Sequence, residues 1–421
     1  MIPSVYSSAV SPLAVRLGAR QVRLRAYAYT ALRSMELVAA WIALAPRTRD
    51  KIVLGTKLGI DAMHLRRLAT RLDEMCLPDP APAATAAIES NFTRAVEITD
   101  VGEQLRFLAA VSRDAQRSMV AYREAESDCA DEPSVLLLDS IGTELVGIAG
   151  RLDRQADEHG SALPFSLVPL EAGVVDAPLT YSENAPIPPL VAFPVREESL
   201  TFANEPAPFG VGFDRDALRG FFHYMFIDVE VSAAEICARM IVEYRHMPIE
   251  FKVDMARQCW DEVRHAVLAI DALHWSGAKE GDSPYCAIVW RRYMSGESLG
   301  ERLAMQQLVQ EGNSCDRAVS IARGLRRAGH IAIADIMDQV TADEVIHVRF
   351  GNRWLMHLCN GSTEQYEQVV TAAQAKLSFP MVAVNPVLRQ MAGFPPFFMK
   401  NLEAEFKRQT AAREAAPRRT A

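Results

Sequence analysis

The pentads Asp261-Glu262-Val263-Arg264-His265 and Asp343-Glu344-Val345-Ile346-His347 are the stretches that decide the fold. Each places a glutamate and a histidine three residues apart, and positions i and i+3 lie on the same face of a helix. A single Glu-x-x-His occurs by chance on many helices. Two near-identical copies predict two helices that each project one carboxylate and one imidazole in the same direction.

A further glutamate precedes each pentad at nearly the same interval. Glu230 stands 32 residues before Glu262, and Glu311 stands 33 residues before Glu344. This interval is expected when an antiparallel helical hairpin sets the first glutamate opposite the Glu-x-x-His pair. Two such hairpins give one helical bundle four carboxylates and two histidines, the ligand set of a di-iron or di-manganese carboxylate site. The alternative is a set of solvated helix faces. We predict a site of two metal ions with six ligands: Glu230, Glu262, His265, Glu311, Glu344 and His347.

These residue types suit iron or manganese. Carboxylate oxygens are hard donors that bridge two ions, and one imidazole per ion adds a neutral donor that limits the negative charge. We expect two iron ions, with manganese or a mixed Mn/Fe pair as the alternative. A metal-bound histidine usually donates its second ring N–H to a carboxylate. Asp261 and Asp343, each just before a pentad glutamate, are candidates for that outer role, and their alternative is a surface acid.

Two further residues near the pattern have alternative interpretations. Arg264 either neutralises carboxylate charge near the site or is exposed. Glu235 follows Glu230 by five residues, well over one helical turn, and is a rival for the ligand on the first helix. We prefer Glu230 because its spacing mirrors that of Glu311, and we keep Glu235 as an outer residue.

Composition and charge indicate a soluble protein with a core. The 421 residues are 49% hydrophobic and 23% charged, which is ordinary for globular proteins, and the net charge of −8 argues against nucleic-acid or anionic-membrane binding. Seven scattered cysteines without Cys-x-x-Cys spacing favour reduced thiols. We see no secretory signal and no apolar run of ~18–20 residues, so we expect a cytoplasmic protein; the arginine-containing start also resembles a transit peptide.

The sequence pattern is helical almost throughout and predicts an all-α fold. Residues 161–212 interrupt it with nine prolines, a density that excludes a helix. We predict an N-terminal helical domain over residues 1–160, a proline-rich linker or strap over 161–212, a four-helix bundle with a dinuclear metal site over 213–380, and a tail over 381–421. The helices are expected at about 24–45, 50–75, 87–127 (one or two), 133–159, 215–245, 249–275, 285–295, 299–311, 314–329 and 329–358. In the tail we expect a turn at 385–386, an apolar knob over 394–399 and a disordered basic end over 413–421.

A weak internal repeat relates the two halves of the chain. An offset of 201 residues aligns His64 with His265 and Asp61 with Glu262, and an offset of 200 aligns Glu144 with Glu344. The positions of Glu230, Glu311 and His347 hold Tyr29, Val111 and Gly147 instead. We interpret the first half as a degenerate second bundle that serves as a scaffold or substrate wall and does not bind metal. Asp61 and His64 are otherwise an ordinary solvated or core pair.

The pentads resemble the Asp-Glu-x-x-His motifs of the ferritin-like di-iron superfamily, and the first is similar to the Asp-Glu-x-Arg-His of bacterial multicomponent monooxygenase hydroxylases. From about Phe221 to Gly393 the chain more closely resembles a bacterial ferritin-like family known only as a domain of unknown function. The features that carry this are Glu230 with Glu235, Met247-Pro248 and Gly351-Asn352-Arg353-Trp354. The stretch 311–316 departs from the family pattern, which leaves open the shape of the pocket beside Glu311. The resemblance implies a ferritin-like fold and a metal site, and no substrate.

Three functions remain open. The first is a di-iron, O2-activating oxidoreductase, such as a monooxygenase, that hydroxylates, desaturates or N-oxygenates a small organic substrate with an electron donor. The large first half and the side chains of Tyr224, Met225, Phe226 and Met305 favour it, although such residues are more often plain core. The alternatives are a ferroxidase or iron-handling protein and a non-catalytic metal-binding module. We expect no nucleic-acid or membrane partner, and a homodimer is compatible with the sequence.

Overall fold

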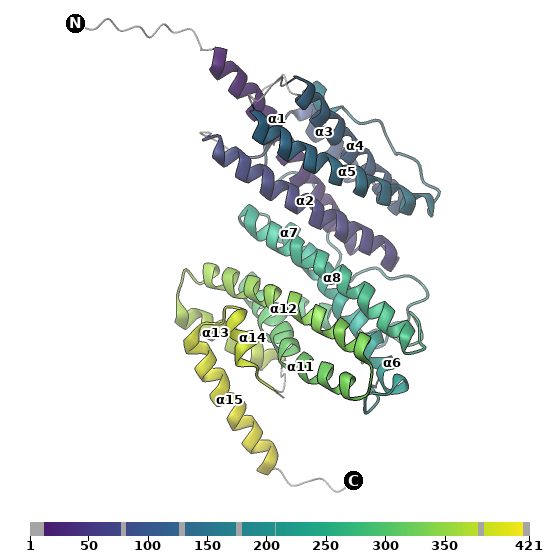
Figure 1. The fold of residues 1–421 in the computed structure, drawn as a ribbon, viewed down its shortest axis with the longest axis vertical. Coiled ribbons are helices and arrows are strands. Elements are labelled where there is room, and N and C mark those ends of the chain that lie inside the picture. The colour runs from purple at the N-terminus through teal and green to yellow at the C-terminus, as the bar shows by residue number, and fades with distance from the viewer. Residues whose placement is uncertain are drawn as a thin grey trace, which may run out of the picture. The chain divides into compact units, whose positions relative to one another are not determined.

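The structure is a computed structural model that describes residues 12–76, 81–125, 131–173, 179–206, 208–377 and 383–415. It is mostly helical, which confirms the predicted all-α class (Figure 1). The chain divides into two compact units, residues 1–195 with 238–257 and residues 196–237 with 258–421. The segment expected as one proline-rich linker is therefore shared: residues 161–195 belong to the first unit and 196–212 to the second.

Long helices build most of the first unit. α1 packs along α2, α4 packs along α5, and α2 also contacts α5. The predicted helices at 50–75 and 133–159 are found within two residues of α2 and α5, whereas the first helix begins at Pro12 and not at Leu24. The helices are α1 (Pro12–Ile42), α2 (Thr48–Glu74), α3 (Ala86–Ala95), α4 (Val101–Ala125) and α5 (Glu132–Asp157).

The proline-rich part of the first unit contains little regular structure. A short 3-10 turn, η2 (Leu170–Gly173), precedes a two-residue strand, β2 (Leu179–Thr180), which pairs antiparallel with β1 (Ala83–Ala84). In this ladder Ala83 lies opposite Thr180. Two residues per strand are too few to show an alternation of polar and apolar side chains, so the sequence pattern did not predict it.

The second unit carries both pentads. A π-helical stretch, η3, interrupts the helix predicted at 215–245, and a second, η4, forms the end of the helix predicted at 299–311; periodicity predicted neither. The boundary between the units runs through α7 and α8. The elements are α6 (Arg215–Tyr224), η3 (Met225–Val231), α7 (Ser232–Glu243), α8 (Ile249–Trp275), α9 (Ile288–Met294), α10 (Leu299–Leu303), η4 (Ala304–Glu311), α11 (Gly312–Arg327) and α12 (Ile331–Leu358).

Three C-terminal helices follow: α13 (Thr363–Leu377), α14 (Pro386–Met391) and α15 (Pro396–Ala415). We did not predict α13, which buries only a few apolar side chains. The expected knob at 394–399 is partly helical, and its Phe394 and Phe398 stack at 5.6 Å within a core cluster that includes Met305 and Leu308 of η4. The basic end expected to be disordered begins inside α15, and residues 416–421 lie outside the described part.

Two smaller observations bear on the sequence predictions. None of the helices in the described ranges combines the length and the apolar character that a bilayer-spanning helix needs. The six cysteines that the structure describes carry free thiols, as the scattered spacing predicted; Cys129 lies outside the described residues.

Candidate metal centre

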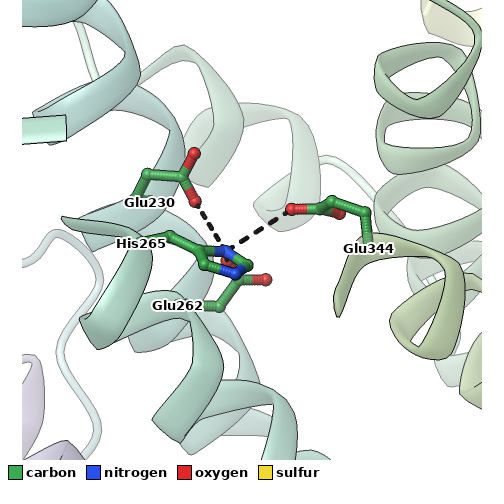
Figure 2. A group of neighbouring side chains, drawn as sticks. All are labelled: Glu230, Glu262, His265 and Glu344. Atoms are coloured by element: carbon green, nitrogen blue, oxygen red, sulfur yellow. Dashed lines mark hydrogen bonds and ion pairs between the residues drawn. The ribbon is translucent and has the colours of Figure 1, made fainter. Parts of the chain in front are cut away.

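The two Glu-x-x-His pairs face each other inside the second unit. Glu262 and His265 come from α8, Glu344 and His347 come from α12, and all four side chains are buried. The Nδ1 atom of His265 lies 3.1 Å from Glu262 Oε2 and 3.7 Å from Glu344 Oε1, so it lies between carboxylates of both helices (Figure 2). On the other side, Nδ1 of His347 lies 3.3 Å from Glu262 Oε1 and 3.7 Å from Glu344 Oε2.

The two upstream glutamates come from the π-helical stretches. Glu230 lies in η3 and Glu311 is the last residue of η4; both are buried. Glu230 Oε2 is 3.4 Å from Nδ1 of His265 (Figure 2). A π-helical stretch shifts the side chains beyond it relative to a regular helix, and such stretches occur frequently at functional sites. The two hairpins thus share the same local distortion at the same kind of residue.

All six residues predicted from spacing are brought together. They form two groups that could each hold a metal ion, and within each group the ligand atoms lie within 4.8 Å of one another. Glu262 and Glu344 belong to both groups. The first group adds Glu230 and His265, and the second adds Glu311 and His347.

The outer nitrogens of the two histidines meet the aspartates of the opposite pentad. His265 Nε2 lies 3.2 Å from Asp343 Oδ2, and His347 Nε2 lies 3.3 Å from Asp261 Oδ2. Arg264 lies near both aspartates, 2.5 Å from Asp261 Oδ1 and 3.2 Å from Asp343 Oδ2. An aspartate that accepts a hydrogen bond from Nε2–H keeps the proton on Nε2, so Nδ1 is directed at the centre with the lone pair that a metal ligand needs.

Two glutamines complete the surroundings and were missed by the sequence analysis. Gln258 Nε2 donates to Glu311 Oε1 at 2.8 Å and to Glu262 Oε1 at 3.3 Å, and Gln306 Nε2 donates to Glu311 Oε1 at 3.1 Å. Helical spacing could have identified Gln258, because it lies one turn before Glu262 on the same face of α8. Gln306 precedes Glu311 by five residues, an interval that faces the same way only in a π-helix.

Glu235, the rival ligand, lies outside both groups. Its buried carboxylate pairs with Arg196, and Arg196 Nη2 donates to Glu235 Oε2 at 2.8 Å. Glu235 therefore pairs with an arginine, whereas the sequence predicted that it would lie beside the metal ligands.

Burial of so many carboxylates changes their protonation. Burial raises the pKa of Glu230 to about 8 and raises that of Glu311 well above its usual 4.5, with neighbouring carboxylates adding to the effect. Burial also opposes charge on Glu262, but the two histidines outweigh it and lower its pKa. For His265 and His347, burial lowers the pKa, yet the surrounding carboxylates raise it well above 6.5. A cluster with this charge pattern favours cations, whether protons or metal ions.

The residues fit a metal by a direct criterion. Buried polar atoms are normally hydrogen-bonded, because an unsatisfied buried group costs about 1–3 kcal/mol. Four atoms of the cluster are buried without a hydrogen-bond partner among the described residues: Glu230 Oε2, Glu311 Oε2, Glu344 Oε2 and His347 Nδ1. Three of them make only ion-pair contacts of 3.3–3.7 Å with other members of the cluster, so bound ions would satisfy groups that the protein satisfies poorly.

The corresponding region of the first unit is arranged differently. Asp61 accepts hydrogen bonds from the buried ammonium of Lys57 and, at 2.6 Å, from Ser34 Oγ. His64 Nε2 lies 3.0 Å from Glu144 Oε2, which brings together two of the residues that the repeat aligned. Among the described residues of this unit, no group of metal-ligating side chains of this kind is found. The Lys57 ammonium supplies the positive charge beside Asp61.

A pocket of about 250 Å3 adjoins the cluster. Glu230 and Glu344 form part of its wall, and so do Tyr224 and Met225, two of the residues considered for substrate contact. The other two, Phe226 and Met305, are fully buried in the core and do not line it.

Residues 171–400 match the family described as protein of unknown function (DUF455). The chain belongs to this family. The matched DUF455 region contains all six cluster residues. No curated protein and no solved structure matches the chain.

Proposed function

We propose that this protein is a ferritin-like, dinuclear metal oxidoreductase that uses O2 to oxidise a small organic substrate. The observation that carries the proposal is the buried set of four carboxylates and two imidazoles, whose ligand atoms lie within 4.8 Å of one another in each of two groups, beside an apolar pocket. A structural salt-bridge network would be expected to close its hydrogen bonds, whereas here Glu230 Oε2, Glu344 Oε2 and His347 Nδ1 make only ion-pair contacts of 3.3–3.7 Å.

The proposed fold of the metal domain is a four-helix bundle. Its helices are η3 with α7, α8, η4 with α11, and α12, and each contributes ligands by the rule of the ferritin-like carboxylate proteins, one Glu or one Glu-x-x-His per helix. The first unit is its degenerate copy, in which Lys57 provides a positive charge beside the remaining Asp61.

The ligands would hold two ions with shared carboxylates. Glu262 and Glu344 would contact both, Glu230 and His265 one ion, and Glu311 and His347 the other. Two divalent cations would match the charge of the four carboxylates, which are otherwise costly to bury. Bound iron would supply two electrons for the reduction of O2. When one oxygen atom enters the substrate, the substrate would supply the other two electrons, the second oxygen atom would leave as water, and an electron donor would return two electrons to the iron.

The protein groups around the ions would tune the site. Asp261 and Asp343 orient the imidazoles, and the Gln258 and Gln306 amides hold the Glu311 carboxylate. The pocket favours an oxidoreductase over a ferroxidase, because an apolar volume beside Glu230 and Glu344 has no use in oxidising free ferrous ions.

The test is an aerobic single turnover after anaerobic loading with ferrous iron. The proposal predicts rapid O2 consumption with about two irons per chain and an oxidised product when a substrate is present. Accumulation of ferric oxide without coupling to any organic compound would favour iron handling, and no O2 consumption would favour a binding module. Glu262→Ala should abolish the reaction, whereas Glu280→Ala, a partly exposed control that pairs with His274, should not.

A further inference from the structure

The pocket beside the cluster has mostly apolar walls. Aromatic and thioether side chains contribute much of them, and Phe209 contacts both Phe221 and Tyr224 edge-on, with ring centroids 6.2 and 5.2 Å apart. Met225, Ile321 and Met337 extend the apolar surface. Most of the volume therefore suits a hydrocarbon body.

The same pocket is lined by two acidic and two basic residues, and only the acidic residues belong to the metal-ligand groups. The acids are Glu230 and Glu344, both members of the metal-ligand groups. The bases are Arg292 on α9 and Arg317 on α11, both partly buried. Once the two glutamates are engaged with metal ions, the guanidinium groups are the remaining charges of the pocket wall. A pocket with this balance attracts an anion.

The two arginines lie near the same phenol. Burial raises the pKa of Tyr224 to about 12, and the charges of Arg292 and Arg317 both act against that rise. Arg292 Nη1 also donates to Gln310 Oε1 at 3.1 Å, which fixes its position at the pocket wall. Burial lowers the pKa of Arg292, because removal from water disfavours the charged form, and a bound anion would act in the opposite direction.

Asn313 adds an unused donor to the same wall. Its side chain is 94% buried, and the structure gives Nδ2 no hydrogen-bond acceptor among the residues it describes. Its orientation is fixed because Oδ1 accepts from Arg389 Nη2 at 3.2 Å, which leaves the amide nitrogen for another partner. Asn313 lines the pocket, so a bound acceptor is the partner that would satisfy this nitrogen.

We propose that the pocket binds a small apolar carboxylic acid, with its carboxylate on Arg292 and Arg317 and its hydrocarbon body extending toward Glu230 and Glu344. Guanidinium groups are the preferred partners of carboxylates because their N–H donors match two oxygens. That this acid is the molecule oxidised rests on the proposed function, whereas its binding does not.

The volume sets the size of the acid. At the ~30 Å3 that a water molecule takes in the liquid, about 250 Å3 accommodates roughly eight non-hydrogen atoms. Octanoate is an acid close to this size and is a suitable probe. The uncharged 1-octanol and the cationic octylamine have the same apolar chain and serve as probes of the charge requirement.

Calorimetric titration of the metal-loaded protein, kept anaerobic, tests the proposal. Octanoate should bind, and octanol and octylamine should bind at least tenfold more weakly. Arg292→Gln and Arg317→Gln should each raise the Kd for octanoate about tenfold, because each removes charge-assisted hydrogen bonds, and should leave the metal content and the affinity for octanol unchanged. Arg323→Gln, on the exposed side of α11, is the matched control and should leave the Kd unchanged.

Equal affinity for octanoate and octanol, or no binding of octanoate, would overturn the proposal. An unchanged octanoate Kd in both pocket variants would also overturn it, because the carboxylate would then lie on the metal ions. The proposed function fails separately: a protein that binds octanoate through the arginines but consumes no O2 with ferrous iron retains the acid site and loses the oxidoreductase assignment. A protein that consumes O2 with ferrous iron but does not bind octanoate retains the oxidoreductase assignment and loses the acid site.

Discussion

Asp343 Oδ2 lies 3.2 Å from Nε2 of His265, a histidine of the other pentad. Asp261 and His347 repeat the relationship at 3.3 Å. Each pentad therefore supplies a Glu-x-x-His to the centre and an aspartate to the histidine opposite. The two helices depend on each other for the orientation of their imidazoles, which makes the pairing of α8 with α12 part of the site itself.

Removal of either outer aspartate should weaken metal binding without removing a ligand. Asp343→Asn and Asp261→Asn replace an acceptor by an amide that no longer fixes the histidine tautomer, and such changes typically cost about 10–100-fold in metal affinity. Competition with a chelator of known affinity measures the effect. Asp335→Asn, on the exposed face of α12 where it pairs with Arg326, should bind metal normally. Parental affinity in both pentad variants would mean that these contacts do not orient the histidines.

Substitution of a glutamate that belongs to both metal-ligand groups should remove more metal than substitution of a glutamate that belongs to one group. Glu262→Ala removes a ligand of both groups and should abolish binding of both ions, whereas Glu230→Ala affects one group and should leave about one ion per chain. Metal analysis after dialysis measures the content, and far-ultraviolet circular dichroism checks that the helices remain. His64→Ala in the first unit should leave the content unchanged. Loss of metal in that variant would contradict the assignment of Lys57 as the positive charge beside Asp61.

The position of the site could be predicted because helical spacing encodes it directly. Residues three apart share a face, and intervals of 32 and 33 residues bring a hairpin back to the same level, so Glu230 and Glu311 were identified without any structure. The helices of the first half followed from apolar periodicity and from prolines at their ends. Helical spacing, apolar periodicity and terminal prolines are all local features of the chain, so they can be read from a single sequence.

The remaining features depend on contacts that spacing does not encode. The residues of η3 and η4 carry no local signal that separates a π-helix from an α-helix. The same holds for the cross-paired aspartates and for Gln306, which reaches Glu311 only in that geometry. Helix α13 was missed because few of its side chains are buried, which leaves a weak apolar stripe. Glu235 forms an ion pair with Arg196 of the proline-rich segment, and no helical spacing rule predicts a contact between a helix and such a segment.

Gly351 should be intolerant of any side chain, because α12 crosses η4 at this residue. A Cβ there would lie 2.5 Å from Gln307 Cβ and 3.0 Å from Leu308 Cδ2, and Gln307 Cβ cannot move without its backbone. Gly351→Ala should therefore cost about 1–3 kcal/mol of unfolding free energy by overpacking. Displacement of η4 should also lower metal affinity, since η4 ends at Glu311. Urea unfolding and metal titration measure the two effects.

Gly147 provides the matched control for that substitution. It lies in α5, and a Cβ would meet nothing within 4 Å beyond the adjacent backbone of its own helix. Gly147→Ala should stabilise the protein by about 0.5–1 kcal/mol, because alanine loses less backbone freedom on helix formation. The same chemical change is thus expected to have opposite signs at the two sites. Equal effects at both would show that the approach of α12 to η4 does not constrain residue 351.

Glu36 makes the stability of the first unit depend on pH. It is fully buried, lies 2.6 Å from Arg33, 2.8 Å from Arg245 and 3.6 Å from Lys252, and accepts a hydrogen bond from the Tyr181 hydroxyl. Burial by itself raises the pKa of Glu36, but the hydrogen bond from Arg245 and the charges of the three basic groups outweigh it. The pKa of Glu36 is therefore below its usual 4.5.

A carboxylate with a lower pKa in the folded than in the unfolded state stabilises the fold above its unfolded value, near pH 4.5 here, and this contribution is lost as pH falls through the folded value. Glu36→Gln removes the anion shared by Arg245 and Lys252, whereas Arg33 keeps Glu89 at 3.1 Å. The substitution should cost roughly 3–5 kcal/mol at pH 7. The difference from the parent should shrink as the pH falls below 4.5, where the unfolded parent takes up the proton first, and should be smallest below the folded pKa, where Glu36 is neutral in both states. Urea unfolding of the metal-free protein at several pH values measures this, with exposed Glu97→Gln as the control. A penalty independent of pH would mean that the packing of Glu36, and not its charge, stabilises the unit.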